Sequence, residues 1–186
     1  MGNRSWLYLE HSSSTADDGA DSQEASANEI AEANNNFPVL WQLLLADGVA
    51  SDAIDHQRVL GDAETDNLAS DAYAALARIR QLHAFVERHP MLHTLPQIAL
   101  QFEALAQHLA ELIDETPDNS APRFSANLDE LSWLDGDAQG DSFIERNRRE
   151  CNERWAEVRR CIESGNHPGV DAALGMHIQD LRIATE

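Results

Sequence analysis

The stretch Glu29–Gly48, EIAEANNNFPVLWQLLLADG, contains the longest apolar run of the chain. This run, Phe37–Ala46, is interrupted only by Gln42. Asparagines precede it, and Pro38 suits the first turn of a helix, where its missing N–H leaves no hydrogen bond unmade. A helix that is apolar nearly all round is normally buried in a core. We therefore expect a central helix that begins near Pro38, ends at Gly48 and is covered by the other elements.

Composition and charge restrict the class of protein. The chain has 186 residues, which suits a single domain, 1–186, with a substantial hydrophobic core. Its formal net charge is -20, because 33 acidic residues oppose 13 basic ones, all of them arginine. A charge this negative opposes binding to nucleic acid and to an anionic membrane, and favours a basic protein partner. The sequence leaves the oligomeric state open.

The sequence also predicts a location in the cell. No segment reaches the roughly 18 apolar residues that a membrane-spanning helix needs. The first residues lack the apolar region of a signal peptide. Cys151 and Cys161 lie in a strongly helical stretch, where their separation along the axis is too large for a disulfide. We therefore expect a cytoplasmic protein with reduced cysteines, of which Cys151 faces the core.

Three segments have the apolar periodicity of amphipathic helices. The first, Leu68–His89, ends at Pro90, and the second, Ile98–Leu112, follows a turn that contains Pro96. Two such helices joined by a short proline-bearing turn predict an antiparallel hairpin. The third segment, Ser142–Ser164, predicts a long helix near the C-terminus.

Short strands are expected near both ends of the chain. Ser5–Leu9 alternates polar and apolar residues, and Met176–Ile183 alternates weakly and could pair with it. The segment 11–28 has small and polar residues, which predicts a mobile loop. Phe124–Leu134 permits either a strand or a short helix. The predicted fold is α+β and mainly α-helical: a helical hairpin and a long C-terminal helix surround the central apolar helix, with a small β-sheet at the termini.

The opening of the chain carries a resemblance. Its residues are Asn3-Arg4-Ser5-Trp6-Leu7-Tyr8, then Asn35, Pro38 and the run Leu43-Leu44-Leu45. This pattern resembles a family of uncharacterised bacterial proteins that begin N-R-S-Y-L-Y and later carry an acidic-Asn-Pro segment before an F/W-x-L-L-L helix. Trp6 replaces the usual tyrosine. Members of that family are loosely similar to immunity and accessory proteins encoded beside bacterial toxins, which implies a binding protein rather than a known activity.

The loop Asp135–Asp141 is the segment most similar to a calcium site. It has oxygen-bearing side chains at loop positions 1, 3 and 5, as in an EF-hand. Position 12, which should supply a bidentate glutamate, is Arg146, and Glu145 is one residue early. The pattern therefore favours an ordinary turn that caps the following helix over an ion site.

Histidines around the hairpin turn raise the alternative of a metal-dependent enzyme. His83, His89 and His93 are close in sequence, and carboxylates follow on the second helix. There is no HExxH motif, and Pro90 separates His89 from His93. His83 lies on an apolar stripe, which is typical of a core histidine.

The third helical segment raises another alternative, a regulatory module that binds an anionic ligand. Residues 146–160 contain six arginines against three glutamates. The competing interpretation is a solvated helix face with the ion pairs Glu145–Arg149 and Glu150–Arg154. The spacing favours the second interpretation.

Our leading hypothesis is an acidic cytoplasmic binding protein, immunity-like or antitoxin-like, that recognises a basic partner by surface complementarity. No G-x-S-x-G, P-loop or G-x-G-x-x-G motif is present, so we assign no catalytic residue, cofactor or metal. Enzymatic activity is accordingly the less expected outcome. The candidate partner-binding residues are exposed acids: Asp62, Glu64, Asp66, Glu111, Asp114 and Glu115.

Overall fold

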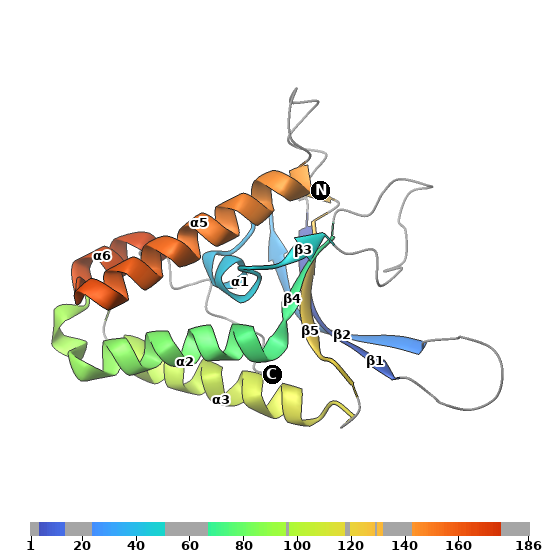
Figure 1. Ribbon diagram of the computed structural model, residues 1–186, viewed down its shortest axis with the longest axis horizontal. Coiled ribbons are helices and arrows are strands. Elements are labelled where there is room, and N and C mark those ends of the chain that lie inside the picture. The colour runs from blue at the N-terminus through green and yellow to red at the C-terminus, as the bar shows by residue number, and fades with distance from the viewer. Residues whose placement is uncertain are drawn as a thin grey trace.

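A computed structural model shows a layer of helices packed on one face of an antiparallel sheet (Figure 1). The structure describes residues 4–13, 24–50, 67–95, 97–117, 120–128, 130–131 and 143–175. In this part of the chain, the sheet has five strands in the order β2-β1-β5-β4-β3. The strands are β1 (Arg4–Ser13), β2 (Glu24–Asn34), β3 (Val49–Ala50), β4 (Asn67–Asp71) and β5 (Arg123–Asn127).

The helices lie to one side of this sheet (Figure 1). Two of them begin at side-chain caps: Asp71 accepts a hydrogen bond from the backbone N–H of Ala74, and Asn166 accepts one from that of Gly169. The described helices are α1 (Val39–Leu44), α2 (Ala72–Arg88), the short 3₁₀ helix η1 (Pro90–Leu92), α3 (Ile98–Asp114), α5 (Phe143–Ser164) and α6 (His167–Leu174).

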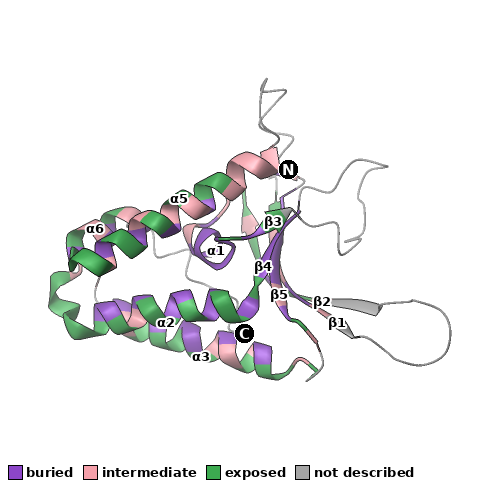
Figure 2. Ribbon diagram, viewed as in Figure 1, coloured by how far each residue is buried: buried purple, intermediate pink, exposed green. Residues whose placement is uncertain are grey.

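The core lies between the sheet and the helices (Figure 2). Side chains alternate between the two faces of a strand, so Leu7 and Leu9 of β1 share a face with their neighbours Ala126 and Phe124 of β5. All four are buried in the core, as is Cys151 of α5. The opposite face of the sheet carries Trp6 and Tyr8, which are half-buried.

The predicted arrangement of the fold is wrong, although the structure is α+β. The sheet is the base on which the helices pack, and none of its described strands comes from the C-terminal part of the chain. The expected long central helix is only the six-residue α1, and the residues before it form β2. α1 is nevertheless buried between α2 and α5, as its apolar surface predicts (Figure 1).

A buried arginine occupies the end of α1. The guanidinium of Arg78 donates to the backbone oxygens of Leu43 and Leu44, each at 2.8 Å. These carbonyls have no partner within a helix that ends here; Arg78 satisfies both, and the hydroxyl of Ser70 also donates to that of Leu44 at 2.6 Å. Desolvation by burial lowers the pKa of Arg78, and the nearby carboxylate of Asp47 opposes this shift.

Smaller predictions have mixed outcomes. The hairpin of α2 and α3 forms, as does the long helix α5, but residues 68–71 are strand β4 rather than the start of a helix. Phe124 lies in strand β5, and α6 was not predicted. The ends of the expected loop 11–28 belong to β1 and β2. The loop Asp135–Asp141 and the expected strand Met176–Ile183 lie outside the described residues.

Both cysteines are free and buried, and Cys151 faces the core as predicted. Burial raises the pKa of the Cys151 thiol to about 12. Among the described residues, no helix combines the length and the apolar character that crossing a membrane would require.

Candidate functional site

A buried carboxylate organises the turn after α2. Asp171 of α6 accepts hydrogen bonds from Nδ1 of His93 at 2.7 Å, from the backbone N–H of Thr94 at 2.8 Å and from the Thr94 hydroxyl at 3.1 Å. The Asp171 side chain is 5% exposed and that of His93 is fully buried. The pair therefore joins the α2–α3 turn to a helix nearly 80 residues later in the chain.

A second imidazole extends this pair into a chain of three groups. Nδ1 of His167 lies 2.8 Å from Nε2 of His93. The carboxylate of Asp171 requires a proton on Nδ1 of His93, which leaves Nε2 of a neutral His93 as an acceptor. His167 must then donate from its own Nδ1, so its Nε2 carries the lone pair. The ring of His167 also stacks on Phe85, with centroids 4.1 Å apart.

The surroundings of His167 favour its neutral form. Burial lowers the pKa of His167, and the neighbouring His93 and His89 lower it further, while Asp171 opposes the shift. The ring of His89 packs edge-on against that of His167, with centroids 5.3 Å apart. We call His89, His93, His167 and Asp171 the histidine cluster. In this arrangement, Nε2 of His167 could accept a proton, and the carboxylate of Asp171 at the other end of this chain of groups would stabilise the added positive charge.

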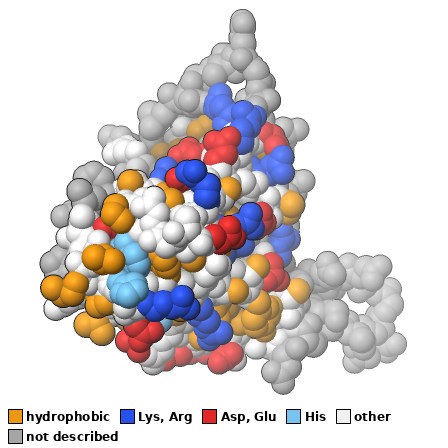
Figure 3. All heavy atoms as spheres, turned by 60° about the vertical axis from the view of Figure 1, so that its left-hand side comes forward, with side chains coloured by type: hydrophobic (Ala, Val, Ile, Leu, Met, Phe, Trp, Pro, Cys, Tyr) orange, Lys and Arg blue, Asp and Glu red, His pale blue; other side chains and the backbone are white. Residues whose placement is uncertain are grey.

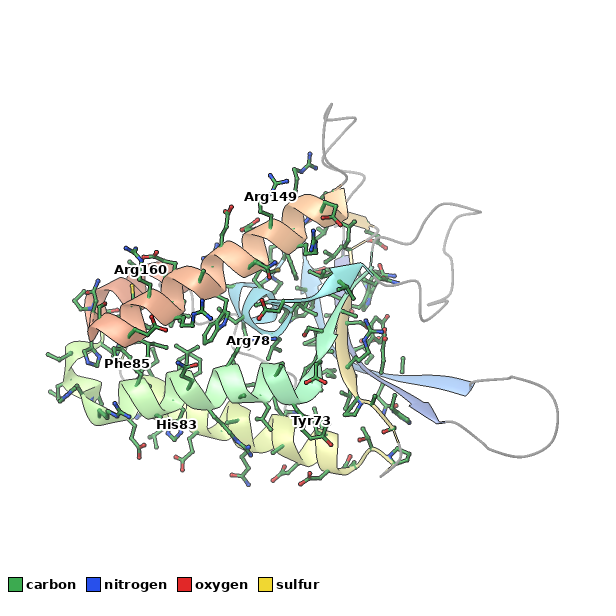
Figure 4. The ribbon with its side chains drawn as sticks, in the orientation of Figure 1. Tyr73, Arg78, His83, Phe85, Arg149 and Arg160 are labelled. Atoms are coloured by element: carbon green, nitrogen blue, oxygen red, sulfur yellow. The ribbon has the colours of Figure 1, made fainter. Side chains whose placement is uncertain are left out.

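The histidine cluster contains only two of the three histidines that the sequence suggested for a metal site. The structure brings His89 and His93 together but leaves His83 on the opposite side of α2 from Phe85 (Figure 4). It adds His167 and Asp171, which no local sequence signal connected with the turn. In the part of the chain that the structure describes, no group of three or more His, Cys, Asp or Glu side chains has the geometry to hold a metal ion.

The surface beside the histidine cluster is apolar. Met91 and Leu92 of η1 are both exposed, and Figure 3 shows hydrophobic side chains gathered around histidine at this end of the molecule. Exposed apolar patches of this kind mark contact surfaces more often than isolated exposed residues do.

The predicted partner-binding residues on α3 form one surface. Glu111, Asp114 and Glu115 are all exposed at the end of α3 nearest the sheet, and Glu103 continues the row toward its beginning. We call these four residues the α3 acidic stripe. α3 contains no lysine or arginine, and no ion pair reaches the stripe from the described residues. The other candidates, Asp62, Glu64 and Asp66, lie outside the described part.

An exposed aromatic side chain lies at the same end of the helical hairpin. Tyr73 is in the first turn of α2, which lies next to the last turn of α3 in this antiparallel pair (Figure 4). This residue is 58% exposed. An exposed tyrosine beside carboxylates combines an apolar contact surface with a negative potential.

Arginines of α5 form ion pairs and hydrogen bonds with other residues of the same chain. Arg148 pairs with Glu145 at 2.6 Å, and Arg154 donates to the backbone oxygen of Ala173 and to the side chain of Gln42. The predicted Glu150–Arg154 pair is present at 3.4 Å, and Glu145 pairs with Arg148, three residues along. The guanidinium of Arg160 lowers the pKa of Glu157 by donating hydrogen bonds to it. These contacts favour a solvated helix face over a site for an anionic ligand.

Comparison with known proteins adds no relative: no family model matches this chain, and neither a curated protein nor a solved structure shows significant similarity to it.

Proposed function

We propose that this protein binds a basic protein partner through the α3 acidic stripe and Tyr73, in the manner of a cytoplasmic immunity or antitoxin protein. The observation that carries the proposal is the contrast between two exposed helices. Four of the five glutamates on α5 pair with arginines of the same helix, whereas the acids of the α3 acidic stripe have no ion pair with a described residue.

The physical basis is electrostatic steering followed by local contact. A row of uncompensated carboxylates attracts a basic surface and mainly raises the association rate. Tyr73 then supplies an exposed ring against which a guanidinium or ammonium group can pack. The overall charge of -20 strengthens the same attraction.

The resemblance of the opening residues to an uncharacterised bacterial family supports the same proposal. The residues that carry it, Arg4–Tyr8 and the Leu43–Leu45 run, form β1 and the end of α1, so they belong to the scaffold rather than to the α3 acidic stripe. The proposal therefore concerns a binding class, and the partner is to be sought first in the product of an adjacent open reading frame.

The test compares two variants of equal charge. In the stripe variant, E103Q/E111Q/D114N/E115Q neutralises four acids on α3; in the control variant, E150Q/E153Q/E157Q/E163Q neutralises four on α5. Association with the purified basic product of the adjacent gene is measured by stopped-flow fluorescence at low salt. We expect the stripe variant to associate about tenfold more slowly or worse, with a small change for the control.

Equal effects of the two variants would mean that only net charge matters, and would overturn the assignment to α3. A further variant, Tyr73→Ala, separates steering from contact. We expect it to raise the dissociation rate and to leave the association rate nearly unchanged, because Tyr73 carries no charge.

A further inference from the structure

A β-bulge in the pairing of β1 with β2 changes the face of the sheet to which carboxylates of β2 point. β1 and β2 pair in regular antiparallel register from Arg4 to Leu7, but Tyr8 pairs with Glu29 rather than Ile30. Ile30 is therefore the extra residue of a bulge. In a regular strand, residues three apart point to opposite faces, which would separate Glu29 from Glu32. The bulge instead lets Ile30 and Ala31 both be buried.

As a result, two aromatic residues of β1 lie opposite two glutamates of β2 on the face of the sheet that carries no helices. Trp6 is directly opposite Glu32, and Tyr8 is directly opposite Glu29. Side chains in such cross-strand positions have Cβ atoms about 5 Å apart. Both glutamates are exposed, and Glu32 already holds the guanidinium of Arg4 at 3.1 Å. This edge of the sheet thus combines carboxylates with aromatic rings, which suits cationic side chains.

β2 also lies at the edge of the described sheet. It is an eleven-residue strand that pairs with β1 and with no other described strand. Figure 1 shows the β1–β2 ribbon extending beyond the other strands and away from the helices. Edge strands are protected by short length, lysine, proline, other charged side chains or a bulge; β2 has the bulge and three glutamates, but no lysine or proline, and it is eleven residues long.

The charges on β2 select the kind of strand that can add to it. Its charged residues are Glu24, Glu29 and Glu32, with no base among them. A second copy of the chain pairing antiparallel about Ile30 would set Glu29 opposite Ala31 and Glu32 opposite Asn28, so neither carboxylate would meet a base. Opposite charges directly across a strand pair stabilise it. The edge therefore offers a second copy no favourable charge pair and favours a basic strand.

We propose that the open edge of β2 receives an extended segment of a basic partner as an additional strand, with basic residues at alternate positions facing Glu29 and Glu32. The alternate spacing follows from β1, whose Trp6 and Tyr8, two residues apart, face the same two glutamates across the bulge. The inference rests on the proposed function only for the basic chemistry of the partner, because it uses a different surface from the α3 acidic stripe.

The probe is a fluorescein-labelled nonapeptide of threonine and valine with arginines at positions 3 and 5, and binding is measured by fluorescence anisotropy. A matched peptide with arginines at positions 3 and 6 places them on opposite faces of a strand. Two further peptides carry N-methyl groups at either the odd or the even residues. Amide N–H groups of alternate residues point to the same edge of a strand, so strand addition tolerates one methylated set and not the other.

The matching protein variants are E29K/E32K on β2 and E150K/E153K on α5, which change the net charge equally. We expect E29K/E32K to weaken binding of the 3,5-arginine peptide about tenfold or more, and E150K/E153K to have little effect. E29K/E32K should also gain affinity for the same peptide with glutamates in place of arginines. Circular dichroism checks that each variant is folded.

Equal binding of the two N-methylated peptides would overturn the inference, as would equal losses in the two protein variants or equal affinity for the 3,5- and 3,6-arginine peptides. The stripe variant of α3 separates this inference from the proposed function. It should bind the peptide as the unsubstituted protein does. Loss of partner binding in the stripe variant, with no peptide binding to β2, would leave the proposed function standing and remove this inference alone.

Discussion

Asp171 illustrates how a single side chain can define a local structure in this protein. It accepts three hydrogen bonds from His93 and Thr94, and thereby holds the turn on which Met91 and Leu92 are displayed. Apolar groups held in place lose less conformational entropy on binding than groups on a loose turn. The buried carboxylate therefore supports a preformed surface at the end of the helical hairpin.

The lowered pKa of His167 predicts a pH dependence of stability. The folded protein binds a proton at His167 less readily than the unfolded chain, whose histidine has its ordinary pKa near 6.5. The stabilising contribution is thus fully present above pH 6.5 and is lost as the pH falls through the folded pKa. We expect urea unfolding free energies to fall more steeply below pH 6.5 in the unsubstituted protein than in His167→Gln. The same slope in both proteins would contradict this account.

At the scale of elements, the long helices and the first strand could be predicted, since Ser5–Leu9 lies within β1, whereas most of the sheet could not. α2, α3 and α5 each carry an apolar stripe within one continuous segment, which is a local signal. β2 reads EASANEIAEAN, whose alanines and glutamates are poor strand formers, so only its pairing with β1 makes it a strand. The bulge at Ile30 also interrupts the alternation of buried and exposed residues by which a strand is recognised in a sequence.

α1 ends before its apolar run does, and the partner of its last carbonyls lies far along the chain. The run continues to Ala46, while Arg78, more than thirty residues after α1, donates to the backbone oxygens of Leu43 and Leu44. Local periodicity cannot predict a cap supplied from another helix. The same limit applies to the candidate site: the acids of α3 could be selected from sequence, whereas the contacts of His93 with His167 and Asp171 required the fold.

The role of Arg78 gives a prediction at this scale. In Arg78→Met, the buried backbone oxygen of Leu43 loses its side-chain donor, whereas that of Leu44 keeps the hydroxyl of Ser70. Leaving one buried acceptor unsatisfied costs about 1–3 kcal/mol, so we expect the free energy of unfolding to fall by roughly that amount. Chemical denaturation measures this change. The control is Arg88→Met on the exposed face of α2, for which a comparable loss would refute the capping role.

At the scale of the whole molecule, the excess of negative charge affects stability, and its effect differs between α3 and α5. A net charge of -20 destabilises the folded chain through repulsion among its own carboxylates. On α5 this repulsion is relieved by ion pairs such as Arg159–Glu163 and Arg160–Glu157. The α3 acidic stripe has no such relief from the described residues, so its acids are expected to cost stability.

This imbalance predicts different salt responses for the two charge-matched variants. Salt screens exposed charges, with a Debye length of about 10 Å at 0.1 M, so added NaCl should stabilise the unsubstituted protein. The stripe variant E103Q/E111Q/D114N/E115Q should be more stable at low salt and should gain less from NaCl, because repulsion has already been removed. The control E150Q/E153Q/E157Q/E163Q loses ion pairs along with charge, so we expect less stabilisation from it. Thermal unfolding at low and high NaCl measures both effects. Equal behaviour of the two variants would show that the repulsion is spread over the whole surface rather than concentrated on α3.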